Sequence, residues 1–338
     1  MSTAPISARV PDLGEPGLPE PVAGVAWRRP TVADAPAMHV AANLSGRVDH
    51  PEYQVPLQEI VDDFAASHVD VERDLVVGER DGAIVAIGSA VMPDGQTDVR
   101  RVFLGGTVVP EARRQGIGAA LLAWEERRAV QRLREHGDDV LPAQIHAWAG
   151  SENATVPFLT SAGYDVVRWF TDLHRDLSQP IEPLDDGGLT IVPFTPDLFE
   201  AGRIARNDAF RDHWGSQPTT AERWGRFVGR DILRSDLSAV AVEGDRIVGF
   251  CLAEHDPDDA AVAGFTSVYV ALVGVIRERR GLGIAPRLLT RTLEAARDAG
   301  LERAVLDVDS ESPTGAVGLY ERLGFTTAKQ SVVLERAW

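Results

Sequence analysis

The stretch Val108-Val109-Pro110-Glu111-Ala112-Arg113-Arg114-Gln115-Gly116-Ile117-Gly118 places glycines where an apolar strand pattern changes into an amphipathic helix pattern. A counterpart follows later in the chain, Gly274-Val275-Ile276-Arg277-Glu278-Arg279-Arg280-Gly281-Leu282-Gly283. Glycine lets the backbone approach a ligand closely, and the unpaired amides at a helix start attract an anion. The arginines add positive charge to both turns. We therefore expect both turns to bind a phosphate-bearing ligand, with ordinary solvated strand-to-helix turns as the alternative.

Two other phosphate-binding motifs do not fit these turns. Neither turn carries the Gly-Lys-Ser/Thr ending of a P-loop. The glycine pattern is also incomplete for a dinucleotide fingerprint, and no first strand of a Rossmann sheet opens the domain. The sequence therefore argues against both classes of nucleotide site.

The chain also repeats itself at a nearly constant offset. The paired segments, in order, are Arg29–Thr31 with Pro193–Thr195, Asp81–Ala86 with Gly244–Gly249, Gln115–Gly118 with Arg280–Gly283, and Ala162–Tyr164 with Leu323–Phe325. The period is far too long for a solenoid, so the repeat predicts two copies of one domain.

The predicted organisation follows from this repeat. Residues 1–24 contain five prolines and are expected to form a flexible arm, followed by domains at 25–177 and 189–338 and a linker at 178–188. Each copy contains a strand, helices, a hairpin, a strand that runs into the glycine turn, a long helix, a strand, a shorter helix and final strands. The fold class is therefore α/β (α+β).

Composition narrows the function classes. The chain has 338 residues, a formal net charge of -17 and one cysteine, Cys251. An acidic protein repels a phosphate backbone, so we expect no nucleic-acid partner. There is no apolar run long enough for a membrane helix and no intrachain disulfide, which favours a soluble, cytoplasmic protein without membrane association. Eight scattered histidines show no metal-binding spacing, so no metal is expected.

The first turn resembles a known family. Arg113-x-x-Gly116-x-Gly118 matches the R/Q-x-x-G-x-G/A acetyl-coenzyme A signature of the GNAT acetyltransferases, and Leu319–Phe325 resembles the family's next helix and strand. The resemblance covers about residues 26–336 as two tandem GNAT domains, each a mixed, mostly antiparallel sheet flanked by helices. In the second copy Glu278 occupies the usual R/Q position, so this copy is expected to rely on Arg279, Arg280 and backbone amides.

The resemblance implies that acetyl-CoA is the cofactor, that the strand before each turn pairs with the pantetheine arm, and that the turn amides hold the pyrophosphate. The coenzyme residues expected in the first copy are Val108, Val109, Arg113, Arg114, Gln115, Gly116, Ile117, Gly118 and Ala119. Those expected in the second copy are Val273, Gly274, Val275, Arg279, Arg280, Gly281, Leu282, Gly283, Ile284 and Ser312.

Acetyl transfer from a thioester to an amine needs a proton for the departing thiolate. Ser312 and Pro313 form a helix-start pattern, which places Tyr320 on the inner face of the next helix. Tyr320 also matches the general-acid tyrosine of many GNAT enzymes. Packing of the helix is the alternative role. In the first copy Leu159 stands at the matching position and cannot donate a proton.

A general base must help to deprotonate the amine. The candidates are Glu254, His255 and Asp256 at the end of the second hairpin, and Asp212, His213 and Trp214 between the first two helices of the second copy. All of them fit solvated loop positions equally well, and Glu254 and His213 are the two selected. His146 and Trp148 are expected to be core or pocket-lining residues.

The leading hypothesis is an N-acetyltransferase that acts on a primary amine of a small molecule, with chemistry in the second copy. A non-catalytic acyl-CoA binder or sensor and a protein-modifying acetyltransferase remain the alternatives.

Overall fold

The computed structural model describes residues 4–312 and 315–338, and it forms two compact units. The first unit runs to Val167 and includes Val332–Trp338 from the end of the chain, and the second spans Arg168–Ser331. The expected linker at 178–188 contains neither helix nor strand. Relative to the predicted boundaries, the last seven residues belong with the first unit.

The first unit is built on a mixed sheet. Its strands follow the order β1-β2-β3-β4-β6-β13, and β5 pairs with β3. The strands span Ala26–Arg28 (β1), Leu75–Arg80 (β2), Ala83–Val91 (β3), Arg100–Leu104 (β4), Thr107–Val108 (β5), Ala143–Gly150 (β6) and Thr326–Ala337 (β13), of which the part from Val332 belongs to this unit. The pairing of β4 with β6 is parallel, whereas β1–β2, β2–β3, β3–β4 and β3–β5 are antiparallel.

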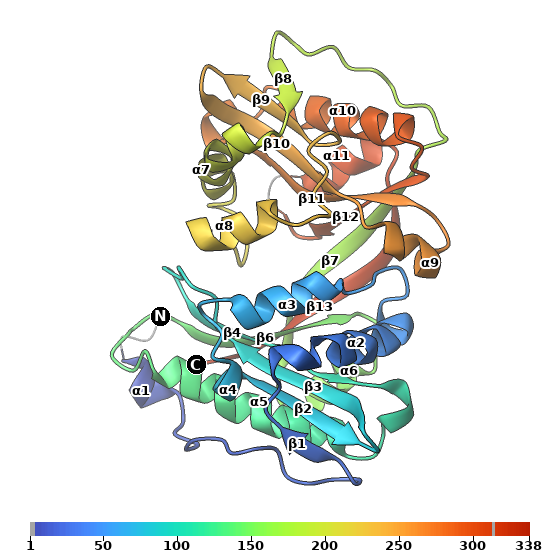
Figure 1. Ribbon diagram of the computed structural model, residues 1–338. Helices are drawn as coiled ribbons and strands as arrows, with labels where there is room; N and C mark the ends of the chain where they lie inside the picture. The colour runs from blue at the N-terminus through green and yellow to red at the C-terminus, as the bar shows by residue number, and fades with distance from the viewer. Residues whose placement is uncertain (1–3, 313–314) are drawn as a thin grey trace. The chain divides into compact units, whose positions relative to one another are not determined.

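Helices pack against this sheet. They span Ile6–Arg9 (α1), Ala35–Asp49 (α2), Leu57–Ala65 (α3), Val71–Asp74 (α4), Ile117–Arg134 (α5) and Thr155–Ser161 (α6). Figure 1 shows α2 and α3 lying beside each other over the strands. The long helix α5 contacts β3 and β4 and buries Leu121, Leu122 and Trp124. The amphipathic pattern predicted after the first glycine turn therefore forms the main helix of this unit.

The N-terminal segment differs from the flexible arm predicted for residues 1–24. Ile6 and Val10 are buried, Arg9 donates hydrogen bonds to the carbonyls of Leu141 and Trp338, and the Trp124 indole donates to Gly17. The prolines interrupt helix and strand along this segment, but these apolar and indole contacts hold it against the first unit.

The second unit repeats the same plan. Its strands follow the order β8-β9-β10-β11-β12-β7. They span Thr190–Pro193 (β8), Ala239–Glu243 (β9), Arg246–Glu254 (β10), Ser267–Val275 (β11), Arg303–Asp309 (β12) and Asp165–Asp176 (β7). The pairing of β11 with β12 is parallel, whereas β8–β9, β9–β10, β10–β11 and β7–β12 are antiparallel. The predicted mixed, mostly antiparallel sheet is confirmed in both units.

Helices α7 (Phe199–Ala209) and α8 (Ala221–Val228) lie on one side of this second sheet, and α10 (Ile284–Asp298) and α11 (Ala316–Arg322) lie on the other (Figure 1). A short helix, α9 (Ala260–Ala263), precedes β11. The apolar positions predicted for α10, namely Ile284, Leu288, Leu289 and Leu293, are all buried. Gly300 follows the helix at a φ of +83°, as expected for a helix stop.

Two local predictions are wrong. The helix expected to start at Ser312 begins at Ala316, with Gly315 at its N-cap in the left-handed region. Pro313 lies outside the described residues. The single strand expected to run into the first glycine turn is two strands, because Gly105-Gly106 interrupts it between β4 and β5.

The place of the C-terminal strand can be tested by removing one of its buried side chains. Leu334 is fully buried in a cluster with Val102 and Ile145, so Leu334→Ala should lower the free energy of unfolding by about 2–5 kcal/mol. Amide hydrogen exchange should increase in β6. The matched change Leu306→Ala, in β12, should increase exchange in β11 and leave β6 nearly unchanged. Faster exchange confined to the second unit in Leu334→Ala would contradict the assignment.

Candidate functional site

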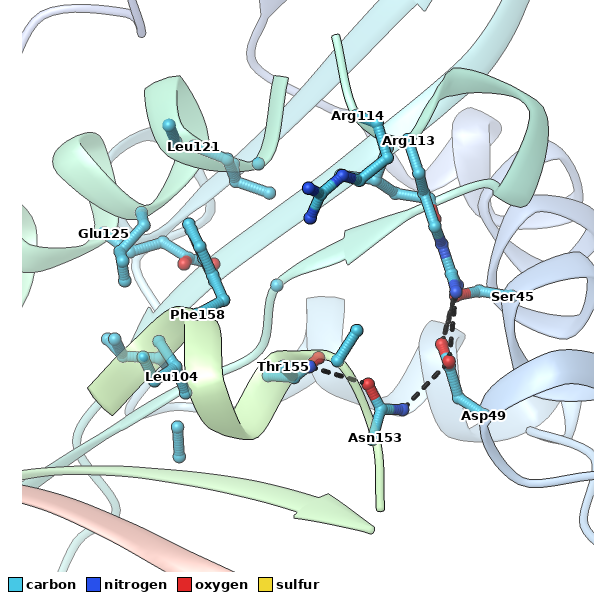
Figure 2. Close-up of a pocket in the computed structure, with 18 of the residues that line it drawn as sticks. Ser45, Asp49, Leu104, Arg113, Arg114, Leu121, Glu125, Asn153, Thr155 and Phe158 are labelled. Carbon is cyan, nitrogen blue, oxygen red and sulfur yellow. Dashed lines mark hydrogen bonds and ion pairs between the residues drawn. The ribbon is translucent and has the colours of Figure 1, made fainter. Parts of the chain in front are cut away.

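A cavity opens in the first unit where two parallel strands separate. β4 and β6 pair from Arg100–Ala143 as far as Phe103–His146, and no further pairing of these strands follows. β5 then pairs with β3 instead. The space between them has a volume of about 460 Å³ and is shown in Figure 2. Its lining includes Leu104, Gly106, Val108, Leu121, Leu122, Ala147, Trp148, Phe158 and Leu159. The lining is mostly apolar and suits a ligand with an extended, weakly polar body.

The first glycine turn forms one end of this cavity. Arg113 donates from Nε to the Val108 carbonyl at 2.9 Å and from Nη2 to Asp49 at 2.7 Å and to the Ser45 hydroxyl at 2.6 Å. Burial acts to raise the pKa of Asp49, but the hydrogen bonds from Arg113 and Ser45 outweigh it and lower that pKa. Arg113 therefore ties the turn to β5 and α2, and its guanidinium is already occupied.

The next residues of the turn face a ligand more directly. Gly116 is the N-cap of α5 with a φ of +85°, and Arg114 has a φ of +62°. Arg114 is exposed, lines the cavity, and has no hydrogen-bond or ion-pair partner among the described residues. The turn therefore offers the amides at the start of α5 and one available cation to an anionic group.

A third element joins this network. Asn153 donates from Nδ2 to Asp49 at 2.9 Å, and its Oδ1 accepts from the Thr155 amide at 2.8 Å. Figure 2 shows this chain of contacts from the turn to α6. The start of α6, which also lines the cavity, is thereby held to the same carboxylate as Arg113.

The second unit repeats the turn in detail. Arg280 donates from Nε to the Val275 carbonyl at 3.4 Å, from Nη1 to Asp212 at 3.1 Å and from Nη2 to the Ala209 carbonyl at 2.8 Å. Gly283 is the N-cap of α10 with a φ of +71°. Arg280 therefore corresponds to Arg113, and Gly283 corresponds to Gly116.

This correspondence corrects the predicted alignment of the two turns. Gly281, with a φ of +78°, corresponds to Arg114 and not to Gly116. The second copy therefore carries a full signature, Arg280-x-x-Gly283-x-Ala285, and the predicted departure at Glu278 is wrong. Glu278 instead accepts from Arg246 at 3.0 Å on the surface. Because the second turn contains two glycines in a Gly-x-Gly pattern, the sequence alignment was displaced by two residues. The backbone φ angles and the arginine contacts give the correct alignment.

The remaining coenzyme residues expected in the first copy fall into two groups. Gly118 and Ala119 line the cavity together with the turn residues described above. Val109 and Ile117 are buried in the core, so only their backbone is available to a ligand. Gln115 accepts from Arg80 at 2.8 Å at the surface.

The residues expected in the second copy are similarly divided. Val273, Gly274 and Val275 lie on β11, where they pair with β10, and Ile284 is buried in the core. Arg279 is on the surface in an ion pair with Glu243 at 2.7 Å, and Leu282 is exposed. The Ser312 amide donates to the Asp309 carbonyl at 3.0 Å.

Tyr320 lies in the second unit, on α11, and is 8% exposed. Its ring meets Phe325 edge to face at 5.7 Å. Burial raises the pKa of the Tyr320 phenol, and Cys251 and Asp307 add to the rise, so the phenol is neutral at physiological pH. In the second copy the Phe325 amide donates to the Tyr320 carbonyl, and in the first copy the Tyr164 amide donates to the Leu159 carbonyl. This match supports the predicted equivalence of Tyr320 and Leu159.

Acidic residues that the sequence did not bring together lie around a second tyrosine, Tyr269. Tyr269 of β11 donates its hydroxyl to Asp307 of β12. Burial raises the pKa of Tyr269, and the charges of Asp307, Glu254 and Asp172 raise it further. These strands therefore concentrate negative charge near Tyr269. The available signal was Asp307 itself, an acidic residue between the buried Leu306 and Val308.

The two candidate bases lie in different surroundings. Glu254 is buried, pairs with Tyr269 across β10 and β11, and accepts from Arg230 at 3.5 Å. His213 lies after α7, with Nδ1 3.0 Å from the Trp214 carbonyl and its ring against Phe210. The structure therefore places Glu254 beside Tyr269 and its acidic neighbours. The His213 side chain contacts Trp214 and Phe210 instead.

His146 and Trp148 lie in the first unit. His146 is buried, with Nε2 2.8 Å from Glu335, and burial lowers its pKa. Trp148 lines the cavity. These placements agree with core and pocket-lining roles.

The comparisons with known proteins follow this geometry. Residues 39–147 and 200–325 match the acetyltransferase (GNAT) family, so each match includes one of the two turns. The chain belongs to the GNAT family of acetyltransferases. The predicted tandem GNAT arrangement, similar in architecture to mycothiol synthase, is confirmed, and the chain is an acyltransferase.

Several relatives carry the name mycothiol acetyltransferase. The one from Salinispora arenicola is 34% identical over 243 residues, covering 68% of this chain and 71% of the relative. The one from Corynebacterium efficiens is 29% identical over 259 residues, covering 76% and 78%. The GNAT similarity therefore extends through both units.

Solved structures show the same fold. A GCN5-related N-acetyltransferase from Sphaerobacter thermophilus matches with a TM-score of 0.69 and 25% identity over 95% of this chain and 97% of its own. A tandem GNAT protein from the clavulanic acid biosynthesis pathway matches with a TM-score of 0.67 and 15% identity, over 93% and 98%.

Within 4–312 and 315–338, no group of His, Cys, Asp or Glu side chains is arranged to hold a metal ion. Among the helices of the described part of the chain, none is both long and apolar enough to cross a membrane.

One buried acid lies beside the cavity of the first unit. Glu125 of α5 is 3% exposed, and its Oε1 has no hydrogen-bond partner among the described residues. Burial raises the pKa of this carboxyl to about 8, partly opposed by the hydrogen bond from the Ser89 backbone and assisted by the charge of Glu126. Glu125 is therefore mostly protonated at neutral pH.

This titration predicts a pH-dependent stability. Between pH 4.5 and about 8 the folded protein keeps a proton on Glu125 that the unfolded chain releases, so rising pH lowers wild-type stability across this window. Glu125→Gln removes the effect, while Glu126 and Tyr164, which also act on this group, stay in place. In urea unfolding, the free energy of unfolding of Glu125→Gln should rise relative to that of the wild type by up to about 1.4 kcal/mol per pH unit. This difference should level off above pH 8. An equal gain in Glu111→Gln, an exposed control, would contradict the assignment.

Proposed function

We propose that this chain transfers an acetyl group from acetyl-CoA to a primary amine of a small molecule, and that the chemistry takes place in the second unit. The observation that carries the proposal is Tyr320, a buried phenol that follows a complete coenzyme turn, where the first copy has Leu159. The proposal gives the two copies different roles: both bind the coenzyme, and only the second supplies a proton to the leaving thiolate.

The coenzyme would be held by the same contacts in each copy. When bound, acetyl-CoA supplies the reactive thioester. The amides at the starts of α5 and α10 would hold its diphosphate, since each helix follows a left-handed glycine that leaves those amides unpaired. Arg113 and Arg280 act as positioning residues, because their guanidinium groups are engaged within the protein.

The acceptor class is supported by the charge around Tyr269. Asp307, Glu254 and Asp172 surround this residue, and a protonated alkylamine is attracted to such a group. An alkylamine with a pKa of about 10.4 must lose a proton before it attacks the thioester. We assign this task to Glu254, which lies across from Tyr269, with His213 as the second candidate.

Tyr320 would return a proton at the end of the reaction. Its raised pKa keeps the phenol protonated, and the same low-polarity surroundings make a free thiolate unfavourable. Tyr320 would therefore donate its phenol proton to the departing sulfur, so that coenzyme A would leave as a neutral thiol.

The relatives' name, mycothiol acetyltransferase, supports a small-molecule acceptor. Release of free thiol from acetyl-CoA with a panel of small amines tests this against the two alternatives. Thiol release that depends on a small amine supports the proposal. Stoichiometric binding without release above background hydrolysis would indicate a sensor, and release only with a protein acceptor would indicate a protein-modifying enzyme.

Tyr320→Phe should lower turnover by roughly 10²- to 10⁴-fold, because it removes a proton donor while keeping the ring. The dissociation constant of acetyl-CoA should stay nearly unchanged. The control is Tyr53→Phe, an exposed tyrosine of the first unit. Wild-type turnover of Tyr320→Phe at every pH would assign Tyr320 to packing against Phe325.

The division of labour is tested by a matched pair at the two N-caps. Gly116 and Gly283 both have a φ in the left-handed region, which a β-branched residue adopts only with strain. Gly283→Ile should abolish turnover, whereas Gly116→Ile should leave most of it. Both rates are measured by thiol release at saturating amine. The reverse pattern would place the chemistry in the first unit and remove the role given to Tyr320.

A further inference from the structure

The cavity of the first unit contains an acid that neither the fold nor the proposed reaction uses. Glu125 lies eight residues after Ile117, the first residue of α5, so its side chain is about 12 Å along the helix from the turn. It lines the cavity, and Figure 2 shows its carboxyl turned toward the cavity. It therefore lies at the far end of the cavity from the turn that would hold the diphosphate.

Gly88 on β3 and Gly106 in the break between β4 and β5 make room for this carboxyl. A Cβ atom added at Gly106 would lie 3.1 Å from both carboxyl oxygens, and one added at Gly88 would lie 3.3 Å from Oε1. Either substitution would crowd the acid. The break between β4 and β5 at Gly105-Gly106 thus gives the Glu125 carboxyl its place between the sheet and the cavity.

The carboxyl is only partly satisfied by the protein. The Ser89 backbone N–H donates to it, and Oε1 has no partner in the described chain. Two arginines of the first unit are engaged elsewhere: Arg128 of α5 pairs with Asp74 at 2.6 Å, and Arg113 of the turn pairs with Asp49. A buried polar group left unpaired destabilises the protein, so a ligand that supplies the missing partner gains affinity.

The second unit shows that the fold does not need an acid here. Thr292 lies eight residues after Ile284, the first residue of α10, and so corresponds to Glu125. Gly249 pairs with Val275 in the second unit as Ala86 pairs with Val108 in the first, so Gly249 corresponds to Ala86. Two residues further along each strand, Cys251 therefore corresponds to Gly88. Both side chains are buried, and burial raises the pKa of the Cys251 thiol to about 12. The second copy therefore fills the space with two small, uncharged side chains.

We propose that Glu125 binds the ligand of the first unit by donating a hydrogen bond from its neutral carboxyl to a carbonyl oxygen, the amide or thioester carbonyl of an acylated pantetheine arm. A neutral carboxyl has one O–H donor, and a carbonyl in an apolar cavity needs one donor. An ammonium group would require the ionised form, which burial disfavours at this position. This inference rests on the proposed binding of the coenzyme by the first unit.

The experiment isolates the first unit in the full-length chain with Gly283→Ile. Titration calorimetry then measures the dissociation constants of acetyl-CoA, CoA and ADP for this parent and for added changes at Glu125. Glu125→Met removes the donor at similar length, Glu125→Thr copies the second unit, and Glu125→Gln keeps an N–H donor. ADP serves as the control ligand, because it carries the diphosphate and lacks the pantetheine arm.

The expected result is a loss of coenzyme affinity of at least about tenfold in Glu125→Met and Glu125→Thr, with ADP affinity unchanged and Glu125→Gln within about threefold of the parent. Loss for acetyl-CoA alone would identify the thioester carbonyl, and loss for CoA as well would identify a pantetheine amide. The thermal midpoint of ligand-free Glu125→Met should be equal or higher, because an unsatisfied buried acid has been removed. A purely structural glutamate would lower it instead.

Two results would overturn the proposal: coenzyme affinity within twofold of the parent in both Glu125→Met and Glu125→Thr, or a loss in Glu125→Gln as large as in Glu125→Met. Either result leaves coenzyme binding by the first unit intact. If the Gly283→Ile parent binds no acetyl-CoA while the wild type does, coenzyme binding by the first unit is wrong, and the role of Glu125 is wrong with it.

Discussion

Both candidate sites depend on an arginine that bonds back to the strand from which its turn has just emerged. Arg113 and Arg280 donate to the carbonyls of Val108 and Val275, and each also reaches an aspartate at or just after a helix end. These contacts hold the chain while a left-handed glycine redirects it into α5 or α10. The arginine contacts therefore orient the free amides at the starts of both helices. The same contacts fix the edge of the strand beside these amides.

The same turn leads to different surroundings in the two units. In the first, Gly105-Gly106 breaks the strand, Leu159 replaces the phenol, and the space between β4 and β6 is lined by apolar groups and Glu125. In the second, β11 is continuous, Cys251 and Thr292 fill the corresponding space, and Tyr320 lies near Asp307. A duplicated domain has therefore kept the geometry that binds an anion and has changed the side chains farther along the cleft.

Much of this plan could be predicted from the sequence. The repeat, the hairpin turns at Asp81-Gly82 and Gly244-Asp245, and the apolar face of α10 are local patterns, and each determines one element. The family signature depends on spacing, so the first turn was recognisable without coordinates. The assignment of the last seven residues to the first unit was not predictable, because strand pairing between distant segments leaves no local pattern.

Other features required the structure for specific reasons. Arg280-Gly281-Leu282-Gly283 can be aligned with the first turn in two ways, and only the φ angles and the arginine contacts choose between them. Glu125 stands in the run Glu125-Glu126-Arg127-Arg128, which resembles a solvated helix face. Burial of Glu125 and Arg128 depends on glycines and an aspartate contributed by other segments, and such complementarity is invisible in one stretch of sequence.

The number of coenzyme molecules bound by each wild-type chain tests the central claim most directly. Native mass spectrometry of the full-length protein, titrated with CoA, counts these molecules without reference to turnover. Two equivalent turns predict two molecules per chain at saturation. Saturation at a single molecule per chain would contradict the account, because one of two turns with the same backbone geometry would then bind nothing.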